Sequence, residues 1–212
     1  MRKRGVLGWA MAVGLVLAGC AGTPAKTPQP AVLRPGPQQA PTHQVVGEAL
    51  IASLGGVSTT VRWLPQRGVQ AFYEGRPGLA DPWPRQLWKD SPPTVFLLRL
   101  RNQTREEVQF DPALAGLVTQ EGKRERPIPY EELYMRMADD KDAVPRLTSL
   151  QATLFSRFVV IQPGGQREGL LVFPALDAKA KHLLLELSSF FVGGRLVPGV
   201  FEFQVFRADS PS

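Results

Sequence analysis

Apolar and polar residues alternate along much of the chain beyond residue 45, and this pattern constrains the fold more than any other feature. Successive side chains of a strand point to opposite faces, so a period of two predicts strands buried on one face. The clearest case is Thr94–Arg101, in which Phe96, Leu98 and Leu100 share one face. Other such runs, bounded by turn residues, occur at 59–64, 108–110, 117–119, 126–128, 158–161, 168–173, 182–188 and 200–206.

The period changes between about residues 130 and 157. Glu131–Met137 indicates a short helix, because its acidic residues stand at the start, where the helix dipole favours them. Four apolar residues from Val144 to Leu154 are spaced as one helical face. The sequence therefore predicts a helical insertion near 130–157. Thr153–Ile161 could instead form one long strand.

Many short strands without βαβ alternation favour an antiparallel sandwich. The order of features in the last 110 or so residues resembles the immunoglobulin-like domains of many bacterial lipoproteins of unknown function. The features are a strand ending at Asn102, a strand at Val108–Phe110, turns at Gly122 and Pro163-Gly164, and the segment Gly169–Pro174. The resemblance implies an antiparallel immunoglobulin-like β-sandwich, in a class of adhesion or assembly modules, and the helical insertion departs from it. Together the pattern and the resemblance predict an all-β, antiparallel immunoglobulin-like β-sandwich with a short α-helical insertion. Residues 45–93 fit it poorly, so they could complete the sandwich or form a separate flap.

The N-terminus has the organisation of a secretion signal. Met1–Arg4 carries three positive charges, and Val6–Ala18 carries none. This uncharged stretch has the length of a signal-peptide core and is too short for a spanning helix, which needs about 20 residues.

The segment Leu17-Ala18-Gly19-Cys20 resembles the bacterial lipobox. The resemblance implies that residues 1–19 are removed and that Cys20 receives acyl groups such as palmitate, which anchor the protein to a membrane. In enteric bacteria an aspartate after the cysteine resembles an inner-membrane retention signal, and this chain has Ala21 instead. We therefore expect a location in the cell envelope, on the periplasmic face of the outer membrane if the source is Gram-negative.

Residues 20–44 comprise the lipidated cysteine and a linker rich in proline, which we expect to reach about 25 Å as a flexible coil and ~70 Å as polyproline II. The sandwich domain is predicted at 45–208 and a short tail at 209–212. Cys20 is the only cysteine, so once it is acylated the domain has no thiol for a disulfide.

The net charge of +6 includes Arg2, Lys3 and Arg4, and without this signal it falls to +3. Such a charge is ordinary, so we infer no nucleic-acid partner. Six basic residues could gather on one side of the sheet, although we favour a solvated face. They are Arg99, Arg101, Arg105, Lys123, Arg124 and Arg126.

A search for catalytic chemistry finds little. Two histidines and one cysteine cannot build a zinc site, and no nucleophile-elbow or phosphate-binding motif occurs. Glu106 and Glu107 are neighbours, so in a strand their side chains diverge. Two acids converging from distant segments, as a glycosidase needs, are not excluded by sequence. We predict no catalytic residue, no metal and no cofactor.

Trp83 and Trp88 lie in an irregular stretch that contains three prolines. Aromatic rings on a loop can stack on sugars or anchor a protein partner. They can equally plug one end of a sandwich, which is the interpretation we favour.

These features together predict a membrane-anchored, non-enzymatic lipoprotein that acts as an interaction or assembly module in the bacterial cell envelope. Its partners would be the membrane, through the lipid on Cys20, and an envelope protein. The alternatives are an envelope glycan-binding protein that uses Trp83 and Trp88 and, behind it, an enzyme of the cell wall.

Overall fold

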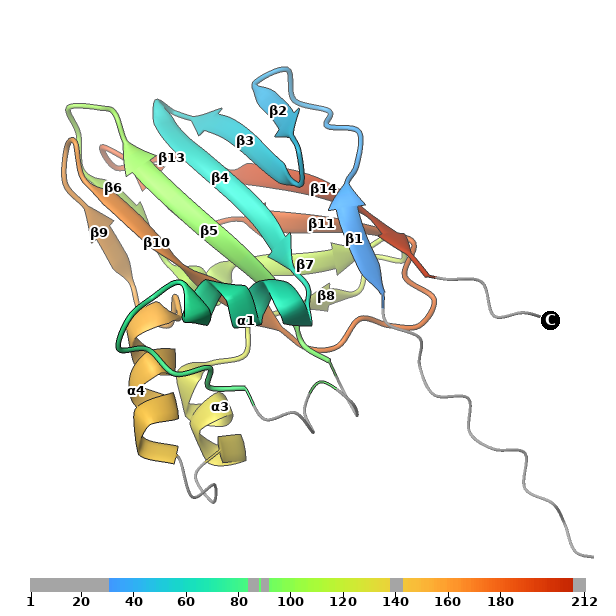
Figure 1. Cartoon of the computed structure of the whole chain (residues 1–212). Coiled ribbons are helices and arrows are strands. Elements are labelled where there is room, and N and C mark those ends of the chain that lie inside the picture. Colours follow the sequence, from blue (N-terminus) through green and yellow to red (C-terminus); the bar gives the residue numbers. More distant parts are fainter. Residues whose placement is uncertain (1–30, 84–87, 89–91, 138–142, 208–212) are drawn as a thin grey trace, which may run out of the picture.

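Antiparallel strand pairing organises the residues that this computed structural model describes, which are 31–83, 88, 92–137 and 143–207. The strands lie in two facing layers, and three α-helices lie outside one of them (Figure 1). The predicted antiparallel β-sandwich with a helical insertion is confirmed. The more specific immunoglobulin-like arrangement remains a prediction.

The first layer is a five-stranded sheet, here called sheet B, with the order β10-β5-β4-β3-β2. Its strands are β2 (His43–Val46), β3 (Ala49–Leu54), β4 (Val57–Leu64), β5 (Thr94–Asn102) and β10 (Gln166–Phe173). The segment 43–64 forms a meander that continues into β5, so β2, β3 and β4 complete this layer and do not form a separate flap.

The second layer consists of sheet A, with the order β1-β14-β11-β7-β8, and sheet C, with the order β13-β12-β6-β9. Sheet A contains β1 (Val32–Pro35), β7 (Gly116–Thr119), β8 (Arg124–Glu125), β11 (His182–Leu187) and β14 (Gly199–Phe206). Sheet C contains β6 (Val108–Phe110), β9 (Val159–Ile161), β12 (Phe190–Val192) and β13 (Arg195–Leu196).

Sheet C continues sheet A beyond a bend. β12 follows β11 after two residues, and β6 leads into β7 through the 3₁₀ turn η1 (Pro112–Leu114). Asp111 and Ser189 mark the bend: the Asp111 N–H donates to the Ser189 carbonyl (3.3 Å), and the Ser189 hydroxyl donates to the Asp111 carbonyl (2.8 Å).

The main core lies between the two layers. β5 contributes Phe96, Leu98 and Leu100, which are buried as the alternation predicted, and Phe96 contacts Phe203 of β14 at 5.0 Å between ring centroids. Burying aromatic and aliphatic side chains in this way is the main stabilising term in a domain without disulfides.

A second core lies on the outer surface of sheet B, beneath helices α1 (Gln66–Glu74), α3 (Tyr130–Met137) and α4 (Ala143–Thr153). On β5 the outward residues Val95 and Leu97 meet this cluster, and the charged Arg99 and Arg101 follow once the helices end. The chain that follows α4 also covers the free edge of β10, because the Phe155 N–H donates to the Leu170 carbonyl (2.9 Å). Covering an edge strand protects it from pairing with other chains.

Two expectations were wrong. The predicted linker at 20–44 contains β1, because Leu33 packs into the main core and β1 pairs with β14 at the other end of the chain. The alternative of one long strand at Thr153–Ile161 also fails, since α4 ends at Thr153 and β9 begins only at Val159. Within α4 the first member of the predicted apolar face, Val144, is exposed, whereas Leu150 is buried.

Candidate functional site

The outer face of sheet C is the most distinctive surface of the described chain. Residues paired across neighbouring strands lie on the same face, and the register of sheet C places Leu196, Phe191, Gln109 and Val160 side by side. Leu196 is 55 % exposed, Val160 is 39 % exposed and Phe191 is partly exposed. We call these four residues the sheet C row. Phe158, one residue before β9, is 56 % exposed.

The row is apolar because two of its strands are apolar on both faces. Phe190-Phe191-Val192 and Val159-Val160-Ile161 each turn some side chains into the main core and leave the middle one outside. An ordinary half-exposed strand would carry polar residues at those outward positions. The outward apolar residues therefore do not serve the core.

A polar network borders the row on one side. The Glu107 carboxylate accepts hydrogen bonds from Gln109 Nε2 (2.8 Å) and from Gln162 Nε2 (2.9 Å). These hydrogen bonds lower the pKa of Glu107. They hold the one polar side chain of the row, Gln109, in a fixed position. The row is thus a flat apolar surface with an ordered, negatively charged margin.

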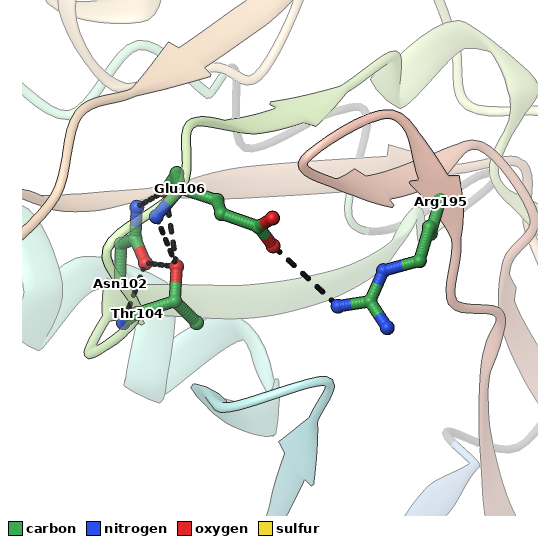
Figure 2. Close-up of polar contacts among 4 residues, drawn as sticks. All are labelled: Asn102, Thr104, Glu106 and Arg195. Atoms are coloured by element: carbon green, nitrogen blue, oxygen red, sulfur yellow. Dashed lines mark hydrogen bonds and ion pairs between the residues drawn. The ribbon is translucent and has the colours of Figure 1, made fainter.

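Asn102 fixes the loops beside this surface (Figure 2). Its side chain is fully buried at the end of β5. Its Nδ2 donates to the carbonyls of Glu106 (2.7 Å) and Ile161 (3.0 Å), and its Oδ1 accepts from the N–H (2.9 Å) and hydroxyl (2.7 Å) of Thr104. Because Ile161 belongs to β9, this one side chain ties sheet B to sheet C.

The backbone of Asn102 strengthens the same junction. Its N–H donates to the Gly165 carbonyl (2.9 Å) and its carbonyl accepts from the Gly164 N–H (3.0 Å). Gly164 has φ +73°, a conformation that favours glycine, so the predicted Pro163-Gly164 turn is formed here.

An ion pair spans the surface beyond this hub. Arg195 Nη2 lies 3.4 Å from Glu106 Oε2, and both side chains are at least half exposed (Figure 2). Such a pair contributes little to stability. Arg195 is the cross-strand partner of the buried Val192, so it lies on the other face of sheet C from the row.

Trp83 is not available as a stacking platform, because it is only 4 % exposed. It packs in the second core with Trp88, whose ring lies at 6.4 Å and 71° to it. The burial of Trp83 excludes the alternative of a ligand contact there and agrees with the favoured interpretation of a plug, although the two indoles fill the space beside α1 and not an end of the sandwich. Trp88 remains partly exposed.

The same plug contains two groups whose pKa is shifted. Tyr73 Oη lies 2.8 Å from Thr153 Oγ1, and burial raises the pKa of Tyr73. The buried Trp83 Nε1 makes no hydrogen bond of good geometry, although it lies near the Tyr73 hydroxyl and lowers its pKa. Asp81 accepts the Trp83 backbone N–H (3.0 Å), and burial raises the pKa of Asp81.

The six basic residues considered as one patch are divided between the layers, and three of them, Arg99, Lys123 and Arg124, form ion pairs with described carboxylates. Arg99 donates to Glu168 (2.7 Å from Nε), which also binds Arg76, two residues after the end of α1. On sheet A, Arg124 pairs with Glu186 and Lys123 with Glu125 (2.8 Å).

Cys20 and the rest of the lipobox, Leu17, Ala18 and Gly19, lie outside the described residues. Within the described ranges, no three His, Cys, Asp or Glu side chains are arranged to hold a metal ion. None of the helices in that part of the chain is long and apolar enough to cross a membrane. No protein-family model matches the sequence, and no curated protein matches it.

Sequence reasoning missed the sheet C row. The signal was present in the two runs Phe158–Ile161 and Phe190–Val192, which are apolar at consecutive positions although they are short. A buried central strand would have the same composition, so only the pairing shows that β9 is an edge and that one face is open.

Proposed function

We propose that this protein is a lipid-anchored, non-enzymatic interaction module of the bacterial cell envelope, attached through Cys20, which binds a partner protein through the sheet C row. The observation that carries the proposal is the sheet C row, in which the outward residues of three of the four strands are apolar and at least partly exposed. Contiguous apolar surface rimmed by polar groups is typical of protein-binding sites.

The chemistry of the row favours a protein over a glycan. Sugar binding uses exposed aromatic faces together with hydrogen-bonding side chains, whereas Leu196 and Val160 offer aliphatic surface only. Gln109 has its amide nitrogen engaged by Glu107. A partner with flat apolar side chains would cover the row, and a cation of the partner could meet the Glu107 carboxylate at its margin.

The position of the row also suits an anchored binding module. β14 runs from the loops near sheet C, where Gly199 contacts Leu54, to Phe206 beside the start of β1. A strand of eight residues spans roughly 25 Å. β1 begins at the Phe206 end of β14 and sheet C lies toward the Gly199 end, so the tether would join the sandwich at the end far from the row (Figure 1).

Site-specific photocrosslinking in the native cells tests the proposal. A photoreactive amino acid at Leu196 should give one discrete adduct, and the added substitution Val160→Asp should abolish it. The matched control places the same group at Val200, which is 43 % exposed on sheet A and should give no adduct. Equal adducts from both positions would contradict the proposed face.

The anchor and the non-enzymatic role have separate tests. Mass spectrometry of the purified protein should find acyl groups on Cys20, and Cys20→Ala should release the protein from membranes. A reproducible hydrolytic activity that is lost on substituting one pair of carboxylates would refute the non-enzymatic role and leave the anchor standing.

A further inference from the structure

The end of the sandwich from which the tether leaves carries both cations and exposed apolar side chains. Val32 and Phe206 are cross-strand partners, 43 % and 42 % exposed, and Arg34 Cζ lies 5.0 Å from the centroid of the Phe206 ring. Lys179 and Lys181 are exposed on the neighbouring strap 174–181. We call these five residues the anchor-end surface.

The strap is held firmly against β14, so the two lysines have a defined place. The Val205 N–H donates to the Lys181 carbonyl (2.8 Å), and Arg207 donates to the carbonyls of Ala180 (2.6 Å) and Asp177 (2.7 Å). On its other side the Gln120 amide donates to the Lys179 carbonyl (3.2 Å) and accepts the Lys181 N–H (3.1 Å).

Cations outnumber carboxylates at this end. The carboxylates of the strap and of the adjoining hairpin are Asp177, Glu121 and Glu125, and Glu125 is paired with Lys123. The exposed cations of the anchor-end surface, Arg34, Lys179 and Lys181, make no ion pair within the described residues.

The length of the tether brings this end to the bilayer. Eleven residues, 21–31, separate Cys20 from Val32. Fully extended they span at most about 40 Å, and as a flexible coil roughly 20 Å. Because β1 is a strand of the domain, the tether is shorter than the predicted linker of 20–44. A short tether gives a high effective concentration, so a weak surface attraction is sufficient for docking.

We infer that the anchor-end surface docks on an anionic phospholipid headgroup surface, with Val32 and Phe206 against the interface and Arg34, Lys179 and Lys181 on the phosphates. Guanidinium and ammonium groups near such a surface attract anionic lipids, and an apolar pair beside them can enter the headgroup region. The inference rests on the proposed acylation of Cys20. It gives the domain one orientation, with the sheet C row directed away from the membrane.

A fluorophore on the full-length lipoprotein tests the inference. Once Cys20 is acylated, an introduced cysteine is the only free thiol. One label is placed by Ala178→Cys on the strap and a second by Gln103→Cys at the opposite end of the sandwich; both positions are exposed. The purified protein is reconstituted in vesicles of phosphatidylcholine and phosphatidylglycerol, two to one, that contain a lipid with a headgroup quencher.

Quenching is expected at position 178 and not at 103, and it should be lost in vesicles of phosphatidylcholine alone. The double variant Lys179→Gln/Lys181→Gln should lower the equilibrium constant for docking on the vesicle surface about 25-fold, because each cation contributes a factor of about five. The matched control, Arg101→Gln with Arg105→Gln, removes the same charge from exposed residues at the other end and should leave quenching unchanged.

Equal quenching at both positions, or quenching at 178 that is the same on neutral vesicles, would overturn the inference while the acylated Cys20 still supports the proposed function. Absence of acyl groups on Cys20 would overturn the inference and the anchor together. Photocrosslinking at Leu196 is independent of both outcomes.

Discussion

Replacing Asn102 tests whether one buried amide holds the two layers together beside the sheet C row. The side chain makes two donated and two accepted hydrogen bonds and is fully buried. Asn102→Ala removes all four and leaves the Ile161 carbonyl buried without this donor. Each hydrogen bond contributes about 1 kcal/mol net, so we expect a loss of about 3–4 kcal/mol in the free energy of unfolding.

Urea unfolding followed by circular dichroism measures this loss, because the midpoint moves while the slope stays constant if only the folded state changes. Thr104→Ala serves as a graded control: it removes the hydroxyl contacts of a partly exposed residue, and about 1 kcal/mol should be lost. A loss below 1 kcal/mol for Asn102→Ala would refute the role assigned to the buried amide.

Asn102→Asp keeps the shape of the side chain and removes its two hydrogen-bond donors, so it tests the hydrogen bonds separately from packing. The carboxylate has nearly the same volume but cannot donate to the carbonyls of Glu106 and Ile161. At neutral pH the variant should be at least as unstable as Asn102→Ala. Burial against the carbonyls of Glu106 and Ile161 raises the folded pKa of this carboxyl although Thr104 still donates to one of its oxygens, so its destabilisation grows as pH rises through that value and is relieved in acid. A deficit independent of pH would contradict this reasoning.

Three further predictions concern the second core and the covered edge of sheet B. Burial raises the folded pKa of Asp81, so the free energy of unfolding should fall as pH rises above the ordinary aspartate value of about 3.9. Urea titrations of Asp81→Asn at several pH values should no longer show that fall. A variant with the same pH profile as the native protein would contradict this prediction. Trp83→Ala empties a buried indole and should cost about 3–5 kcal/mol, with unchanged stability refuting its place in the core. Gly169→Ala would put a methyl group 2.9 Å from the Phe155 ring and 3.0 Å from the Thr153 carbonyl oxygen. We therefore expect the free energy of unfolding, measured by thermal unfolding, to fall by about 1–3 kcal/mol. A stabilised variant would show that this close approach is absent.

The strands with clear alternation were the predictable part of the fold. The alternation of apolar and polar residues correctly predicted which residues are buried in β5, β11 and β14. One face of each strand meets the main core, and each strand is long enough for the alternation to repeat. Helix α3 was also predicted, since its acidic first turn and its apolar spacing agree.

Short elements whose structure depends on distant partners were missed. β1 has four residues, includes a proline, and pairs with a strand at the far end of the chain. Helix α1 has nine residues, with Gly68 in its first turn, yet Val69, Phe72 and Tyr73 have helical spacing and are all buried. In both cases tertiary packing outweighs local preference.

The candidate site was less predictable than the fold because it depends on registers. No local pattern indicates that Val160, Gln109 and Phe191 lie in one row, since they come from three segments of the chain. For the tryptophans the favoured interpretation was a buried plug, and Trp83 is buried, but in the second core beneath α1, a position that no local pattern indicates.

The pairing of β1 with β14 has a mechanical consequence. A partner held at the sheet C row and a lipid at the tether would pull the domain from opposite ends, along the axis of β1. Antiparallel hydrogen bonds lie across the strand direction. The four register pairs from Val32–Phe206 to Pro35–Phe203 would therefore bear such a force together, in shear, and would not open one after another. With the proposed anchor at Cys20, the first strand after the tether would transmit force from the membrane to β14 and through it to the rest of the fold.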